Sequence, residues 1–308
     1  MTPTDDRRIA DELEQRLRTM LPGTYQDRYD EVRPVSMGSS GLRFDADGKV
    51  AWNEIWGSFC DLALAGGPPH KGMLLEPASR REIAAAPDRH ASVRSEICRG
   101  IAMVTELDAA PSADPGWVRV ECLTRAMAAW LVRAITMENV AVRADGAALE
   151  LPAGPDYRLE KEIKNVVTSI AKTNHYWIGH MSVSQWRAIA ALFDGMAEES
   201  PAIAAAYRYD GPGPDPRARL ADEAADAIRR ETGLIRAPRR YLDWLGVECP
   251  TVRAAVWMTR TMNVLNVAAR REHAALFMPI NPATDPDARI VVSSVALAHR
   301  LAAAQGRL

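Results

Sequence analysis

Apolar side chains recur along the chain at two spacings, one typical of helices and the other typical of strands. Between residues 5 and 20 every third or fourth position is apolar, which predicts an amphipathic helix. Over residues 118–122 apolar and polar side chains alternate, which predicts a strand with one buried face. A helix over 124–138 follows, with Thr124 as its N-cap. Residues 140–151 then predict a hairpin that turns at Asp145-Gly146 in the type I′ manner.

This strand–helix–hairpin pattern occurs twice. Positions 117–155 align without a gap with positions 244–282, and 17 of these 39 positions are identical. Chance would give roughly one match in ten for a chain of this composition. Such self-similarity indicates an internal repeat. We expect an α+β fold of two lobes related by a pseudo-two-fold axis, each with a strand–helix–hairpin core flanked by helices.

The repeat also predicts the organisation of the chain. Residues 1–49 form an N-terminal helix and a Gly- and Ser-rich lead-in, residues 50–180 the first repeat, and residues 181–308 the second. A helix over 159–173 closes the first repeat. Each repeat is expected to begin with a helix whose buried face is aromatic and aliphatic: Trp52, Ile55, Trp56 and Phe59 in the first, and Trp186, Ile189 and Phe193 in the second.

Composition narrows the class of protein. The chain has 308 residues, of which 47% are hydrophobic and 25% charged, and its net charge is −2. This near balance provides no basic surface for nucleic acid, and no apolar run approaches the length of a membrane helix. The first residues lack the pattern of a signal peptide, and the four cysteines show no CxxC spacing. We therefore expect a cytoplasmic protein that binds a small molecule rather than nucleic acid or a membrane.

Several polar residues are the same in both repeats, and each allows a structural and a functional interpretation. The cysteines are either core residues or thiols whose pKa is lowered ahead of a helix. The asparagines follow a helix, where they either cap its C-terminus or bind a ligand. The arginines and glutamates either form ion pairs between the lobes or bind an anion. The pairs are Glu121/Glu248, Cys122/Cys249, Arg133/Arg260, Asn139/Asn266 and Arg143/Arg270.

Two segments of the first repeat carry polar residues that the second repeat does not keep. Residues 66–72 (Gly-Gly-Pro-Pro-His-Lys-Gly) combine a stiff, closely approachable backbone with His70 and Lys71. This loop is either a grip for an anionic ligand or an ordinary rigid turn. The second segment, residues 161–180, contains three of the five lysines of the chain and ends in a cluster of two histidines and two aromatic residues.

On a helix, Lys161, Lys164, Thr168 and Lys172 would share one face that leads toward His175. Such a face is either solvated or part of a binding site. The second repeat ends in Ala-Ala-Ala-Gln where the first has its histidine-rich tail. Chemistry present in one copy and missing from the other favours a single site built on a duplicated frame.

The sequence thus predicts an enzyme that acts on a small anionic or carboxylated molecule by acid–base chemistry, with one site formed mainly by the first repeat at the repeat interface. His175 and His70 are the expected acid–base residues. The expected ligand-binding residues are Lys71, Lys172, Arg133, Arg260, Asn139, Tyr176 and Trp177.

Two alternatives stay open. One is a non-catalytic protein that holds a ligand or cofactor at the pseudo-symmetric interface through the paired arginines and asparagines. The other is a metal site that uses His175 and His180, with His70 or Glu162 as a candidate additional ligand. The spacing of His175 and His180 is not the i, i+4 spacing of ligands on one helix face, so this site needs a break in the helix at Gly179. The sequence identifies neither a cofactor nor an oligomeric state.

Overall fold

The computed structural model describes residues 3–32, 41–55, 61–209, 211 and 213–308. The chain divides into two compact units, Pro22–Trp186 and a second unit made of Met1–Leu21 with Arg187–Leu308. Each unit contains helices and one small antiparallel sheet, so the protein belongs to the α+β class. None of the described helices combines the length and the apolar character needed to cross a bilayer.

The sheet of the unit Pro22–Trp186 has one apolar face. Its strands, in spatial order, are β1 (Ala109–Pro111), β2 (Trp117–Glu121), β4 (Ala148–Pro152) and β3 (Arg143–Asp145). Val118 lies opposite Leu151 and Val120 opposite Leu149, and all four side chains are buried. The alternation predicted for this strand is therefore confirmed, because its apolar side chains share one face.

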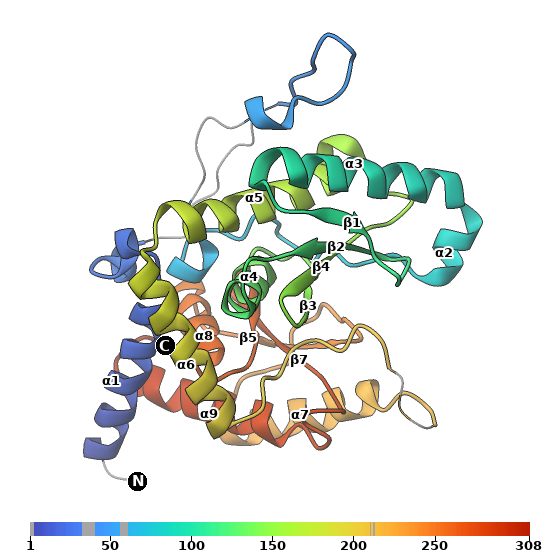
Figure 1. The fold of residues 1–308 in the computed structure, drawn as a ribbon. Coiled ribbons are helices and arrows are strands. Elements are labelled where there is room, and N and C mark those ends of the chain that lie inside the picture. The colour runs from blue at the N-terminus through green and yellow to red at the C-terminus, as the bar shows by residue number, and fades with distance from the viewer. Residues whose placement is uncertain (1–2, 33–40, 56–60, 210, 212) are drawn as a thin grey trace. The chain divides into compact units, whose positions relative to one another are not determined.

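Helices of the same unit pack around one central helix. The helices are α2 (Arg80–Ala85), α3 (Pro87–Thr105), α4 (Arg125–Met137) and α5 (Lys164–Gly179), with a π-helical turn, η5 (Leu159–Ile163), directly before α5. Helix α5 packs against both α3 and α4, and Figure 1 shows α3 running alongside it. Because of this central position, neighbouring elements enclose most of the surface of α5. This burial determines the chemistry of its polar side chains.

The local signals of the sequence located most of these elements correctly. Thr124 caps α4, since its Oγ1 accepts a hydrogen bond from the Met127 N–H at 3.1 Å. The hairpin forms as predicted, but its two-residue loop is Gly146-Ala147, and Gly146 has a φ of 63°. A positive φ at the first loop position, without one at the second, is the type II′ pattern rather than the expected type I′. The turn is therefore one residue later than predicted.

The boundaries of other helices differ more from the predicted ones. Helix α3 begins at Pro87, and helix α2 was not predicted. A capping box between Ser79 and Glu82 starts α2. The helix expected from Trp52 is wrong in the described part, where residues Trp52–Glu54 form a single 3-10 turn, η3. Trp56 and Phe59 lie outside the described residues.

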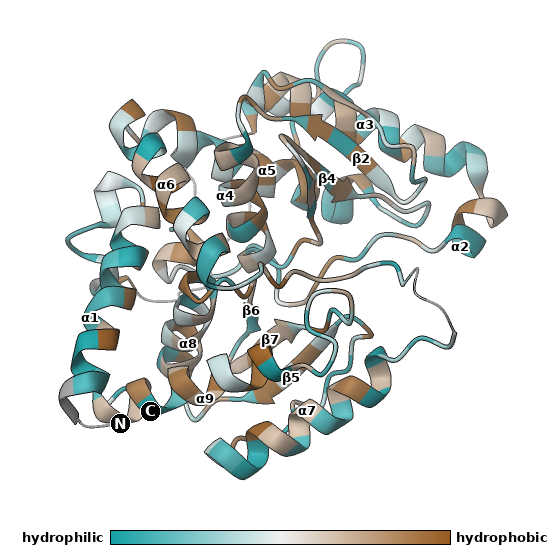
Figure 2. Ribbon diagram, turned by 60° about the horizontal axis from the view of Figure 1, so that its bottom comes forward, coloured by the Kyte–Doolittle hydropathy of each residue, from teal (hydrophilic) through white to brown (hydrophobic). Residues whose placement is uncertain are grey.

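The second unit combines helices with a three-stranded sheet. Its elements are α1 (Pro3–Met20), α6 (Val183–Glu199, which begins in the other unit), α7 (Arg217–Thr232), β5 (Trp244–Glu248), α8 (Val252–Val264), β6 (Arg270–Glu272), β7 (Ala275–Pro279) and α9 (Arg289–Ala304). The strands lie in the order β5-β7-β6. In Figure 2, α1 and α7 are striped in teal and brown, as expected of helices that pack through one face, while β5 and β7 are largely brown.

The strands of the two units pair in the same register. Trp117 lies opposite Pro152 in one sheet, and Trp244 lies opposite Pro279 in the other. Thr251 caps α8 through a hydrogen bond from the Ala254 N–H, as Thr124 caps α4. Equivalent positions in these strands and caps are separated by the same 127 residues that align the sequences.

Candidate functional site

Helix α5 is buried on its polar face as well as on its apolar face. Lys164 and Thr168 are each 8% exposed, Asn165 is 7% exposed, and Ser169 and Lys172 are fully buried. The interpretation of this face as a solvated lysine stripe is therefore wrong, although Lys161, one turn earlier, is exposed. Tertiary contacts enclose the face, and a buried polar surface requires an explanation because desolvating such groups is costly.

Glu138 compensates the buried charge of Lys172. Its Oε1 lies 2.9 Å from the Lys172 Nζ, and both side chains are almost completely buried. The same carboxylate accepts hydrogen bonds from the Ala63 N–H at 3.0 Å and from the His70 N–H at 2.8 Å. With these donors a buried ion pair is tolerated, because the remaining lone pairs of the carboxylate are satisfied.

These contacts hold the loop 62–72 against α4 and α5. The Lys71 N–H donates to the Glu138 carbonyl, and the Asn139 Nδ2 donates to the Lys71 carbonyl at 2.6 Å. Gly67 leaves no room for a side chain, since a Cβ there would lie 2.1 Å from the Asp61 carbonyl oxygen. Both the glycine and the polar contacts fix the backbone from which His70 projects.

His70 lies among three lysines. The pKa of its imidazole is lowered to about 3, mainly by burial and then by the positive charges of Lys172, Lys71 and Lys164 in that order, while a hydrogen bond with Asn165 opposes the shift. The ring is therefore neutral at physiological pH. An anion placed beside it would reverse the effect of the lysines and favour the imidazolium form.

Four enclosed polar atoms on α5 find no hydrogen-bond partner among the described residues. One, Asn174 Oδ1, lies toward the C-terminal end of the helix, and the other three are Asn165 Nδ2, Thr168 Oγ1 and Ser169 Oγ. Asn165 lies one helical turn before Ser169, and Thr168 lies one turn before Lys172. The unpartnered atoms of Asn165, Thr168 and Ser169 therefore lie on the same helix face as the lysines. Buried polar groups are nearly always satisfied, and exceptions mark positions where a ligand, an ion or water completes the bonding.

The corresponding face of α9 is apolar. At the positions 127 residues after Lys164, Asn165, Thr168 and Ser169 the chain has Val291, Val292, Val295 and Ala296. Val291 and Val295 are buried in the core of their own unit. Glu138 likewise has Leu265 as its counterpart. Lys172 corresponds to His299, so the face of α9 is apolar at four of these five positions and polar at the fifth. Most of the polar side chains on this face of α5 are therefore not a requirement of the fold.

A second polar group surrounds the C-terminal end of α5. The Tyr25 hydroxyl lies 2.7 Å from both the Tyr176 hydroxyl and an Asp61 oxygen. Burial, and then these hydrogen bonds, raise the pKa of Tyr25 above its usual range. The imidazoles of His175 and His180 approach each other, with 3.1 Å between their Nε2 atoms. Both histidines are exposed, so His175 and His70 occupy different environments.

The remaining predicted site residues have structural contacts. Trp177 is buried, stacks on Trp186 at 5.8 Å between ring centres, and lies near Trp130. Arg133 donates to the Ala129 carbonyl one turn earlier on α4, and burial lowers its pKa to about 10. Arg260 is buried on α8, in the other unit.

The asparagines common to both repeats occupy the left-handed region. The φ angles are 61° at Asn139 and 64° at Asn266, each directly after a helix. Asn266 donates to the Ser200 carbonyl at 2.8 Å, as Asn139 does to that of Lys71. This is the geometry of a helix C-terminal cap, in which asparagine replaces glycine.

The cysteines have the properties of core residues. Burial raises the pKa of Cys122 and of Cys249 to about 12 in each case. The alternative of a reactive thiol ahead of a helix is therefore wrong for both, because a thiol that is protonated at neutral pH is a poor nucleophile.

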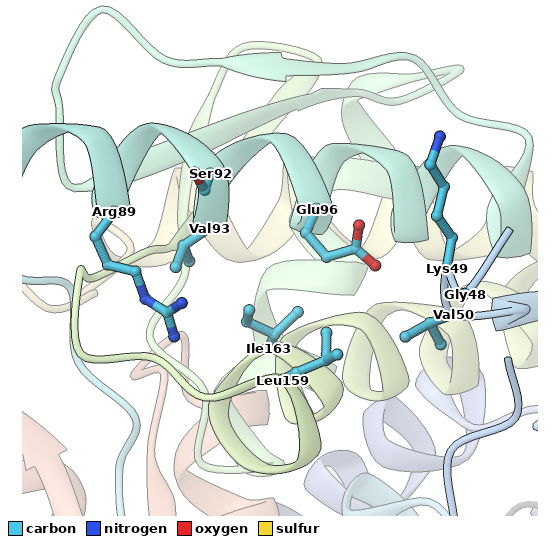
Figure 3. Close-up of a pocket in the computed structure, with 9 residues that line it drawn as sticks. All are labelled: Gly48, Lys49, Val50, Arg89, Ser92, Val93, Glu96, Leu159 and Ile163. Atoms are coloured by element: carbon cyan, nitrogen blue, oxygen red, sulfur yellow. The ribbon is translucent and has the colours of Figure 1, made fainter.

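A hollow of about 280 Å³ lies between α3 and η5 (Figure 3). In Figure 3, Arg89 and Glu96 reach from α3 on either side of apolar side chains. The Glu96 carboxylate is already held by the Trp52 Nε1–H at 2.8 Å and by Arg99. The hollow thus offers an apolar surface without an available acid–base group. Its lining residues are Gly48, Lys49, Val50, Arg89, Ser92, Val93, Glu96, Leu159 and Ile163.

Sequence reasoning located His70, Lys71 and Lys172 but missed their partners. Nothing in the local sequence marks Glu138, Asn165 or Ser169 as members of one cluster. A signal was present in the comparison of the two copies, where these polar residues have apolar counterparts. Comparisons with protein-family models, with curated proteins and with solved structures found no match to this chain.

Proposed function

We propose that the polar face of α5, with Lys172 and His70, binds a small anionic or carboxylated molecule, and that His70 transfers a proton to or from it. The observation that supports this most strongly is the contrast between α5 and α9. A helix face that is mostly aliphatic in one unit is polar, cationic and incompletely hydrogen-bonded in the other. Such a departure from good packing is typical of functional sites.

The chemistry follows from the charges. Glu138 neutralises the charge of Lys172. A bound anion would therefore be attracted chiefly by Lys71 and Lys164. Both lysines lower the pKa of His70, so their charges lie near its ring. The enclosed hydroxyl and amide groups of Thr168, Ser169 and Asn165 would then donate to the bound oxygens. The anion would raise the pKa of His70 toward neutrality, where an imidazole is an effective acid–base catalyst.

We assign proton transfer to His70 and not to His175, which the sequence ranked beside it. His175 is exposed and paired with His180, whereas His70 lies among the lysines. The alternative of a non-catalytic binding protein uses the same anion site without the proton transfer, and conversion of the ligand separates the two.

We also propose that the two units arose by internal duplication and retain a common frame. The matching strand register, helix caps and left-handed asparagines support this, together with the aligned sequence. On this view the anion site is a later, one-sided addition. A cytoplasmic location and the absence of nucleic-acid binding remain expectations from composition and charge.

Binding is tested by calorimetric titration of the full chain with inorganic phosphate, acetate, succinate and citrate. We expect at least one of them to bind the wild type, and Thr168→Val to weaken its affinity by about tenfold, the loss of one hydrogen bond to a charged ligand. Thr168→Val should not destabilise the protein, and a gain of about 1 kcal/mol is expected because it removes an unsatisfied buried hydroxyl.

Thr173→Val is the matched control. Thr173 is a second buried threonine of α5, but its hydroxyl donates to the Ser169 carbonyl at 2.9 Å. Its replacement should leave the affinity unchanged. Equal affinities for wild type and Thr168→Val would contradict the anion site.

The catalytic part is tested with any ligand that binds. Proton transfer to carbon is detected by NMR as deuterium uptake into the ligand in D2O, and other conversions appear as new ligand resonances. We expect such a change with wild type and its loss with His70→Gln. Binding without any change in the ligand would leave the non-catalytic alternative.

A further inference from the structure

We propose that His175 and His180 form a binding site for a divalent transition-metal ion of the zinc, nickel or copper class. The two residues lie at the C-terminal end of α5, outside the cluster around Glu138 and Lys172. This site does not depend on the anion site proposed above.

The end of α5 brings the two imidazoles together. Five residues separate them in the sequence, which on a continuous helix would direct them to different faces. Helix α5 ends at Gly179, and His180 leaves the helical conformation with φ −126° and ψ 7°. The His180 carbonyl accepts a hydrogen bond from the Gly23 N–H at 3.2 Å, which anchors the turn. The break expected at Gly179 thus produces the approach.

The separations of the two rings are compatible with chelation of one metal ion. The Nε2 atoms are 3.1 Å apart and the ring centres 4.9 Å apart. For rings placed symmetrically, lines from the ring centres through Nε2 meet about 2.0 Å beyond each nitrogen at an angle of about 105°, close to the bond length and tetrahedral angle of zinc–histidine sites. The two Nε2 atoms are also within hydrogen-bond distance of each other, so a bound metal ion would replace an N–H···N hydrogen bond.

The electrostatics of the site suit a metal ion. Burial and the neighbouring His180 lower the pKa of His175, which favours the neutral imidazole that metal binding requires. The described residues contain no group of three or more His, Cys, Asp or Glu side chains arranged around one metal position. Water or a ligand would therefore complete the coordination, as in sites that remain open on one side.

Calorimetric titration of the full chain with ZnCl2 and NiCl2 at pH 7.5 tests the site. We expect one saturable binding event, weakened at least tenfold by either His175→Ala or His180→Ala, since each removes half of the protein ligands. Both side chains are exposed, so the variants should fold. Circular dichroism of each variant checks this. His299→Ala, a histidine in the other unit, is the matched control and should bind as the wild type does.

A second readout excludes effects of folding. Zn2+ should raise the melting temperature of the wild type and of His299→Ala, but not of the double variant His175→Ala/His180→Ala. The double variant should still bind the anion that the wild type binds, which separates the two sites. Metal affinity that is equal in the wild type and the double variant, or the lack of saturable binding by the wild type, would overturn the metal site.

Discussion

His70 differs from an ordinary surface histidine in its response to pH. In the unfolded chain it takes up a proton near its normal pKa of about 6.5, whereas in the folded protein its pKa is about 3. Between these values the unfolded chain holds one more proton, so stability falls as the pH is lowered through this window and is unaffected above it. Burial of a neutral imidazole is thus a source of acid sensitivity.

Replacing His70 by Gln should remove this sensitivity. Between pH 6 and 4 the free energy of unfolding of the wild type should fall more steeply than that of His70→Gln, by up to about 1.4 kcal/mol per pH unit. Urea denaturation at several pH values measures the difference. Parallel pH dependence in the two proteins would show that the folded state protonates His70 normally.

At the scale of elements, one ion pair joins α5 to the end of α4. Lys172 and Glu138 are almost completely buried, so neither is solvated when its partner is removed. We expect Lys172→Met to destabilise the protein by about 3–5 kcal/mol, because it leaves the Glu138 charge buried and uncompensated. The double variant Lys172→Met/Glu138→Gln should recover most of this loss, which chemical denaturation measures.

An exposed pair provides the control for that measurement. Arg289 and Asp287 form an ion pair with side chains 83% and 53% exposed. Arg289→Ala should change stability by less than about 1 kcal/mol. A Lys172→Met variant as stable as Arg289→Ala would mean that the buried pair is absent.

The helix ends of α4 and α8 are a second test at this scale. Asn139 and Asn266 have φ angles of 61° and 64°, which glycine adopts without strain and alanine does not. Both replacements remove the side-chain hydrogen bond, so the difference between Ala and Gly isolates the backbone. We expect Asn→Ala to be less stable than Asn→Gly by about 1 kcal/mol at each position.

Thermal and urea denaturation of the four variants, Asn139→Ala, Asn139→Gly, Asn266→Ala and Asn266→Gly, provide the comparison. Similar Ala–Gly differences at both positions are expected from the shared geometry. A difference near zero at either position would indicate that the left-handed conformation there is relaxed.

For the whole molecule, the sequence predicted what depends on local signals. The strand β2, the Thr124 cap and the hairpin are specified by alternation, a capping side chain and turn residues within a few positions of one another. The helix expected from Trp52 failed, because an apolar spacing does not distinguish a helix from irregular chain packed into a core.

The candidate site was only partly predictable for the same reason. Lys172 and His70 were recognised as unusual residues, but the burial of Lys172 depends on Glu138 and on the loop 62–72, which are distant in sequence. Periodicity cannot show that a polar helix face is enclosed. The apolar counterparts of Asn165 and Thr168 in the second copy were the one sequence signal for it.

The site on α5 is tested most directly by the pKa of His70 itself. Its imidazole C–H resonances in the full chain, assigned with His70→Gln, are followed by NMR from pH 7.5 downward, with and without the tightest-binding anion of the panel. We predict a pKa well below 6.5 in the free protein and a clear upward shift when the anion is bound. A normal pKa in the free protein, or a pKa that the bound anion does not raise, would contradict an anion site beside a partly buried, neutral His70.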